Sequence, residues 1–515
     1  MSKEKIKPAS AGIWQKCTAF LERIDTSDAS RLPVRLTYLY LSIPMYIFFF
    51  GWLKIGYALL MAAVLTAGLF FAWNTAPEMD VSQLCRKNLP KLLGVGLVAV
   101  LWMYFSGIGG LSYQNFDHQW RNAVLTELVN RDWPVIVTDS EYFEHPAALI
   151  YYFALWLPAA LVGKGFGMEA AHSMLFYWCL IGVLLCFSLI LGLCKRLSVW
   201  IVLGFALFSG LDTVGDFLLH NSSNYLWFTG NHIEYWMTYD FQMSSMSTQL
   251  LWVFNQAIPA WLITLLLLLQ KDNRSLIFVY SFSFLSCTLP AIGMLPIAFC
   301  IGIRRIVQLY DKEKPFKENL KPLCQDVFTF QNLGTGLLLT AVSYLFLKSN
   351  TQSANGFHGV DIKALFMCYL VFCFLEFVIY YLVIYRVHRQ NPLYWVTLAT
   401  LLIVPLIKVG YFADFIMRAS IPSLVVLFIL VIEAFLRYHQ EGAKKAFAAL
   451  LAVFLLGSLT AYHELNRTLF NTVEHAKDPA AQPLLADEID LIEGSTRSNF
   501  YGEIQDSFFF NHLAK

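Results

Sequence analysis

The stretch YQNFDHQWRNAVLTELVNRDWPVIVTDSEYFEHP, residues 113–146, is polar and aromatic and lies between strongly apolar segments. Read as a helix from about residue 116, it has an apolar stripe at spacings of four, made by Phe116, Trp120, Val124 and Leu128. The adjoining face is polar and carries Asp117, His118, Arg121 and Asn122. A helix with two such faces is typical of the membrane interface. The stretch therefore predicts an interfacial helix that holds the carboxylate of Asp117 at the water–lipid boundary.

The composition of the whole chain is that of an integral membrane protein. Its 515 residues are 57% hydrophobic and 14% charged, with a mean hydropathy of +0.54, whereas soluble domains carry about 25% charged residues. The net charge is +1, so charge gives no case for nucleic-acid binding. The ten cysteines form no CxxC pair and therefore suggest neither a zinc ribbon nor a redox pair.

Apolar runs predict an all-α polytopic membrane protein with about thirteen transmembrane helices. Segments rich in Lys and Arg set the orientation, because short cytoplasmic loops carry an excess of these residues. This rule places the N-terminus in the cytoplasm and the C-terminus outside. The spans are expected at about 36–53, 55–73, 92–109, 172–193, 199–210, 247–270, 275–289, 290–303, 333–348, 364–386, 393–410, 421–437 and 446–462.

This topology divides the chain into a large membrane domain and two flanking segments. Two large loops of the membrane domain are expected on the extracytoplasmic side, and the first contains the stretch quoted above. The parts are a cytoplasmic N-terminal segment 1–35, a transmembrane domain 36–462 with extracytoplasmic loops 110–171 and 211–246, and an extracytoplasmic tail 463–515.

The apolar run at 147–163 is expected to lie at the membrane interface or to re-enter the membrane. If it crossed the bilayer, the next span would leave Lys195 and Arg196 on the extracytoplasmic side, against the positive-inside rule. Interfacial helices in the first large extracytoplasmic loop are therefore part of the predicted fold.

Titratable side chains gather in the segments that this topology places outside. Of the eleven histidines, only His388 and His439 fall on the cytoplasmic side. Such groups suit acid–base catalysis, metal binding or substrate hydrogen bonding, and the alternative is that the outer loops are simply more hydrated. Asp117 is the leading catalytic candidate, and its alternative role is an i,i+4 ion pair with Arg121. The candidate substrate-binding residues are His118, Arg121, Asn122, His145, His232, Glu234 and Asp240.

The stretch LIKVGYFADFIMRASIP, residues 406–422, is the second informative element. Lys408 lies near the outer end of a span, and Asp414 and Arg418 flank the turn into the next. Basic groups at this depth suit the phosphate of a lipid, Arg through bidentate hydrogen bonds. The alternative is an Asp414–Arg418 pair with snorkelling side chains. Glu376, in the middle of a span, suits either a structural hydrogen bond or an ion path.

Residues 92–200 resemble the GT-C superfamily of integral membrane glycosyltransferases, which includes the protein mannosyltransferases and the lipid A aminoarabinose transferase. The resemblance rests on an acidic residue on an amphipathic helix after an early span, the segment His145–Pro146, the link LVGKGFGMEAAHSM and a span ending in CKRL. The chain departs from the family pattern because two spans, instead of one, precede the span that delivers the loop. Asp117 is also followed by His118 and not by a second acid.

The resemblance implies roles for three residues. Asp117 matches the first-loop acid that acts as general base or orients the acceptor. Arg418 and Lys408 occupy positions suited to the donor phosphate. No HExxH, P-loop or GxSxG motif occurs. No cofactor is implied, and whether a divalent metal ion takes part is left open.

The implied function is transfer of a sugar from a polyprenyl-phosphate donor to a glycan, lipid or protein acceptor on the extracytoplasmic face of a plasma (inner) membrane. One alternative is a flippase or transporter of lipid-linked glycans, which would place charges along a path through the spans. Another is a non-catalytic subunit of an envelope polysaccharide assembly complex.

Overall fold

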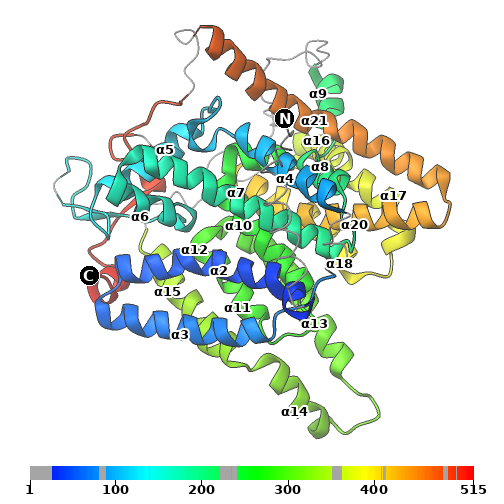
Figure 1. Cartoon of the computed structure of the whole chain (residues 1–515), viewed down its shortest axis with the longest axis horizontal. Coiled ribbons are helices and arrows are strands. Elements are labelled where there is room, and N and C mark those ends of the chain that lie inside the picture. Colours follow the sequence, from blue (N-terminus) through cyan, green and yellow to red (C-terminus); the bar gives the residue numbers. More distant parts are fainter. Residues whose placement is uncertain are drawn as a thin grey trace, which may run out of the picture.

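The computed structural model describes residues 26–80, 88–138, 140–220, 233–234, 241–350, 362–407, 409, 413–478, 485–494 and 496–515. The regular elements in these ranges are helices and three short strands (Figure 1). The chain is thus an all-α protein, as predicted, and its apolar helices are those of a multi-pass membrane protein.

Nine helices in the described ranges are long and apolar enough to cross a membrane. Two of these nine include a π-helical turn, and a third begins a few residues before its apolar part. They are formed by α2 (Thr26–Trp52), α3 (Ile55–Asn74), α7 (Met168–Leu193), α10 (Met246–Leu269), α13 (Thr288–Leu309), η4 (Phe330–Gly336) with α15 (Leu337–Leu347), α16 (Ile362–Cys373) with η5 (Phe374–Val378) and α17 (Ile379–His388), α20 (Ile421–Gln440) and α21 (Lys444–Lys477).

The predicted count of thirteen spans is not what the structure shows. A transmembrane helix needs about 20 residues, and four predicted spans form shorter helices. They are α4 (Leu89–Tyr104), α8 (Val199–Ala206), α11 (Leu276–Ser281) with α12 (Ser283–Ser286), and α18 (Pro392–Ile403) with η6 (Val404–Leu406).

Backbone breaks explain why these apolar runs are shorter as helices than as sequence. After α8 the chain leaves the helical path, and the backbone N–H of Leu211 donates to the carbonyl oxygen of Leu375 on another span, at 3.1 Å. The helix α12 ends at Cys287, whose φ of −153° is extended. Hydrophobicity alone does not reveal such breaks, because the residues that follow them are also apolar.

The helix α10 lies at the centre of the bundle (Figure 1). In its most apolar window 94% of the residues are buried, against 33% for the peripheral α3. It packs against α7, α20 and α13. It is also broken at Val253, whose φ and ψ of −134° and 34° are not helical.

The first large loop and the C-terminal segment fold together at one end of the bundle, called the loop face below. Strands β1 (Ile136–Val137), β2 (Ala147–Leu149) and β3 (Tyr501–Glu503) form an antiparallel sheet in the order β1–β2–β3. Beside it lie α5 (His118–Asn130) and α6 (Leu157–Phe166), which pack on each other and on α7. The chain ends in η8 (Phe509–Leu513), packed against α15.

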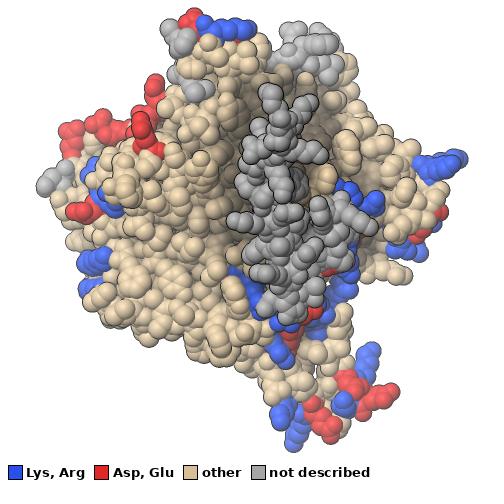
Figure 2. Space-filling model, in the orientation of Figure 1, with Lys and Arg blue, Asp and Glu red and all other residues tan. Residues whose placement is uncertain are grey.

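The remaining short helices connect the longer elements. They are η2 (Ile108–Gly110), η3 (Ala154–Trp156), α9 (Asp212–His220), α14 (Phe316–Val327), α19 (Asp414–Ala419) and η7 (Arg497–Asn499). The residues of η3 are fully buried. Figure 2 shows a broad uncharged expanse over the left-hand part of this side, with Lys, Arg, Asp and Glu gathered along its edges and on α14. A surface of this kind suits contact with the hydrocarbon of a bilayer.

Candidate functional site

The break in α10 creates the docking point for α5. The carbonyl oxygen of Leu251 accepts a hydrogen bond of 2.7 Å from Asn115 Nδ2 and one of 3.1 Å from His118 Nε2. A helix end or break leaves carbonyl groups that need donors, and Asn115, just before α5, and His118, its first residue, supply them. Burial lowers the pKa of His118 to about 4, and the charge of Arg121 adds to this. The ring is therefore neutral near pH 7.

Arg121 joins Asp117 to the same break. Its guanidinium nitrogen donates to the carboxylate of Asp117 at 3.2 Å and to the carbonyl oxygen of Trp252 at 3.1 Å. The i,i+4 ion pair considered above as the alternative to a catalytic role is thus present. The Arg121 side chain is 6% exposed, whereas that of Asp117 is 28% exposed. The pair therefore holds the Asp117 carboxylate at a rim that solvent reaches.

Helix α21 extends this network from the other side. Glu464 accepts from the Trp252 indole N–H at 3.1 Å and from Arg467 at 3.3 Å. The Arg467 guanidinium group also lies 5.2 Å above the Trp252 ring, a cation–π contact. Sequence reasoning missed all three residues. The spacing of Glu464 and Arg467, typical of a helical ion pair at the end of the last apolar run, is the one signal that could have found two of them.

Arg418 lies in α19, is 5% exposed and pairs with Asp414, as the alternative reading of this stretch expected. Burial alone would lower the pKa of Arg418, but the Asp414 carboxylate outweighs it and keeps the pKa raised. The guanidinium group is therefore charged although it is buried.

Tyr151 connects Arg418 to the network around α5. Burial raises the pKa of Tyr151, the ring of Tyr152 at 3.8 Å adds to the rise, and the charges of Arg121 and Arg418 both oppose it. Both arginines therefore act on one hydroxyl, although they are separated by almost three hundred residues of sequence. Tyr151 and Tyr152 carried no signal in the sequence.

Each of the two arginines has one buried hydrogen-bond donor that is not used by any described residue. Within the described ranges, the buried Nε–H groups of Arg121 and Arg418 have no hydrogen-bond partner. A buried guanidinium N–H without an acceptor is costly, and a bound anion would satisfy it. The loop face thus combines two buried cations with the carboxylates of Asp117 and Asp414.

The other predicted site residues lie elsewhere or have structural partners. Asn122 donates to Gln114 at 2.9 Å and to the carbonyl oxygen of Ala486 at 3.3 Å, which ties α5 to the C-terminal segment. His145 is exposed and lines a separate pocket with residues of that segment. Three predicted residues lie outside the described ranges: Lys408, His232 and Asp240.

Glu234 belongs to a buried acidic cluster away from α5. Its Oε1 accepts from Thr248 Oγ1 at 2.6 Å and from the backbone N–H of Ser245 at 3.2 Å. The carboxyl group of Glu376, in the π-helical turn η5, is near Glu234 and is hydrogen-bonded to that of Asp212. π-helical turns often occur at functional sites. The second loop therefore contributes to a different polar centre from the first.

No group of three or more His, Cys, Asp or Glu side chains in the described part of the chain could hold a metal ion. Comparisons of the chain with protein-family models, with curated proteins and with solved structures gave no match.

Proposed function

We propose that the chain is a membrane glycosyltransferase that moves a sugar from a polyprenyl-phosphate donor to a hydroxyl group of a glycan, lipid or protein acceptor. The observation that carries the proposal is a pair of buried guanidinium groups, Arg121 beside Asp117 and Arg418 beside Asp414, each with an Nε–H that has no partner in the described ranges. Two buried guanidinium groups suit a phosphate, and a rim carboxylate suits an acceptor hydroxyl. The loop face would then be the extracytoplasmic side of a plasma (inner) membrane.

The proposed reaction needs few chemical groups from the protein. Arg418, together with Lys408 from the neighbouring stretch, would hold the donor phosphate. Asp117 would orient the acceptor hydroxyl and take its proton as the oxygen attacks the anomeric carbon. The bond from that carbon to the phosphate oxygen breaks, and the polyprenyl phosphate leaves with its negative charge stabilised by the arginines. Positioning and charge stabilisation are thus the main contributions of the protein.

Binding of undecaprenyl phosphate to the purified protein in nanodiscs tests the donor site. We expect Arg418→Gln to weaken binding at least tenfold. The matched control is Arg437→Gln, which removes an arginine from an i,i+4 pair with Glu441 on the far part of α20 and should bind like wild type. Thermal unfolding of both variants checks that they are folded. Equal binding by wild type, Arg418→Gln and Arg437→Gln would remove the donor site and the main support for the proposal.

One observation favours a second candidate, a transporter of lipid-linked glycans. Glu376 is buried within a span and shares a hydrogen bond with Asp212, and ionisable groups at such depth often line transport paths. Movement of a fluorescent lipid-linked glycan between leaflets of proteoliposomes distinguishes the two candidates. Movement that Glu376→Gln abolishes, without any sugar transfer, would favour the transporter. No movement and no transfer would leave a non-catalytic subunit of an envelope assembly complex.

A further inference from the structure

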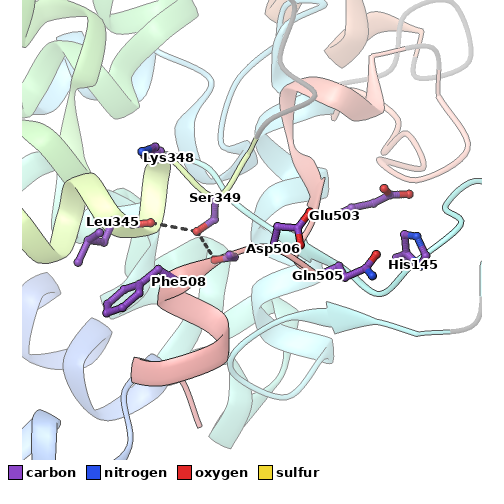
Figure 3. Close-up of a pocket in the computed structure, with 9 residues that line it drawn as sticks. His145, Leu345, Lys348, Ser349, Glu503, Gln505, Asp506 and Phe508 are labelled. Atoms are coloured by element: carbon purple, nitrogen blue, oxygen red, sulfur yellow. Dashed lines mark hydrogen bonds between the residues drawn. The ribbon is translucent and has the colours of Figure 1, made fainter.

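A pocket of about 420 Å³ lies at the loop face, between the end of α15 and the C-terminal segment (Figure 3). His145 from the first loop contributes to one edge of it. In Figure 3, Lys348 and Phe508 lie on one side, Gln505 and His145 on the other, and Asp506 between them. The volume is within the range of roughly 300–1,000 Å³ that small-molecule sites occupy.

The walls of this pocket are held by contacts beneath them. The hydroxyl groups of Ser349 and Ser507 are hydrogen-bonded at 2.6 Å, which joins α15 to the C-terminal segment. Asn350 Nδ2 donates to the carbonyl oxygen of Ser498 at 3.0 Å. Glu503 accepts from the backbone N–H of Glu144 at 3.0 Å, which fixes the first loop to the same wall. The lining is therefore arranged before any ligand binds, which lowers the entropic cost of binding.

The lining chemistry indicates the class of ligand. Carboxylates at Glu503 and Asp506 and the amide of Gln505 are planar groups that can bind two neighbouring hydroxyl groups at once. The Phe508 side chain is 55% exposed and offers an aromatic face for the C–H side of a sugar ring. The lining has two carboxylates and one ammonium group, that of Lys348, so the net negative charge of the pocket disfavours an acidic ligand.

We propose that this pocket binds a sugar ring that is neutral or carries an amino group. Binding here does not require that the chain transfers sugars. If it does, as proposed above, the pocket would hold a sugar unit of a glycan at a distance from the reacting groups, since His145 is not part of the Asp117 network. Anchoring part of a long acceptor in this way would favour glycans over free monosaccharides.

Isothermal titration calorimetry of the full chain in nanodiscs tests whether the pocket binds sugars. The four trisaccharides used are maltotriose, the N-acetylglucosamine trimer, the glucosamine trimer and trigalacturonate. We expect at least one neutral or amino-bearing trimer to bind and trigalacturonate to bind at least tenfold more weakly. Asp506→Asn and Phe508→Ala should each weaken that binding at least tenfold. Both side chains are exposed, so these substitutions should leave the fold intact. Phe328→Ala, which removes an equally exposed ring far from the pocket (62% exposed), is the matched control.

Three results would overturn the proposal. They are the absence of millimolar binding for all four trimers, tightest binding of trigalacturonate, and unchanged binding in both pocket variants. A loss of undecaprenyl phosphate binding in Arg418→Gln with sugar binding intact would show that the two sites are separate. Sugar binding without any donor binding would contradict the glycosyltransferase proposal and leave the pocket as proposed.

Discussion

The guanidinium group of Arg121 donates a 3.1 Å hydrogen bond to the carbonyl oxygen of Trp252, 131 residues away in the sequence. The same nitrogen holds the carboxylate of Asp117. The helix α5 of the first loop is thus hydrogen-bonded to the break in α10, the most buried helix of the bundle. The position of the proposed catalytic carboxylate therefore depends on the backbone of α10.

Removing the Asp117 carboxylate should affect transfer far more than stability. Asp117→Asn keeps the size of the side chain and a hydrogen-bond acceptor for Arg121, but it removes the base. We expect transfer from a polyprenyl-phosphate sugar to fall by about 10²–10⁴-fold, with the melting temperature close to that of wild type. Transfer in proteoliposomes, normalised to folded protein, measures this. Full activity of Asp117→Asn would exclude the proposed role.

Replacing Arg121 should weaken the seating of α5. Arg121→Ala leaves the Trp252 carbonyl without this donor and Asp117 without its counter-ion. Since hydrogen bonds to charged groups contribute about 1.5–3 kcal/mol each, we expect the free energy of unfolding to fall by roughly that amount. Denaturant unfolding in detergent measures the change. Arg437→Ala, an exposed arginine in an i,i+4 pair, should behave like wild type, and an equal loss in both variants would contradict the interpretation.

Acidification should destabilise the protein through His118. Its folded pKa of about 4 lies below an unfolded value of about 6.5, so the unfolded state binds the proton first. The free energy of unfolding should therefore fall as pH decreases from about 6.5 towards 4, by up to about 3 kcal/mol from this group. His118→Gln can still donate to Leu251 and should flatten the pH dependence. His439→Gln, on the opposite end of the bundle, should not, and identical profiles for wild type and His118→Gln would contradict the assignment.

Two adjacent phenylalanines should differ strongly in their effect on stability. Phe509 is fully buried, and its ring packs against Phe48 and Phe346, whereas Phe508 is 55% exposed. Phe509→Ala should cost about 3–5 kcal/mol and release the C-terminal segment. Phe508→Ala should cost little. Limited proteolysis and thermal unfolding of both variants compare them, and a protease-resistant C-terminus in Phe509→Ala would show that the docking depends on other contacts.

Gly210 should not tolerate a side chain. A Cβ atom there would lie 2.0 Å from Oε2 and 2.7 Å from the Cα atom of Glu376, so relief would require the backbone to move. We expect Gly210→Ala to lower the melting temperature clearly, and Glu376→Ala in the same chain to restore only part of it. Gly96→Ala, where a Cβ meets nothing within 4 Å, should be neutral or stabilising by up to about 1 kcal/mol. A neutral Gly210→Ala would contradict the close packing of Gly210 against Glu376.

The sequence predicted local helical structure well, but it predicted the lengths of the apolar helices less well. Four-residue spacing predicted a helix from about Phe116, and α5 begins at His118. The Asp117–Arg121 pair could also be expected, because residues four apart on a helix are neighbours. The count of spans was too high because apolar composition continues through breaks such as Cys287, where the backbone leaves the helix.

The amino-acid sequence by itself determined the membrane class, the helical content and the presence of α5, since each depends on composition or on contacts within a few residues. It did not determine which face of α5 is buried: His118, Arg121 and Asn122 of the predicted polar face are buried, and Phe116 of the predicted apolar stripe is 68% exposed. Only the tertiary structure decided that Arg121 bonds the Trp252 carbonyl, that Trp252 joins Arg467 to this network, and that the C-terminal segment forms a pocket with α15. The reason is physical. These contacts involve carbonyl groups that a helix break leaves without helical partners, and side chains that are hundreds of residues apart. The spacing of residues within one segment cannot predict which distant donor will bind such a carbonyl group.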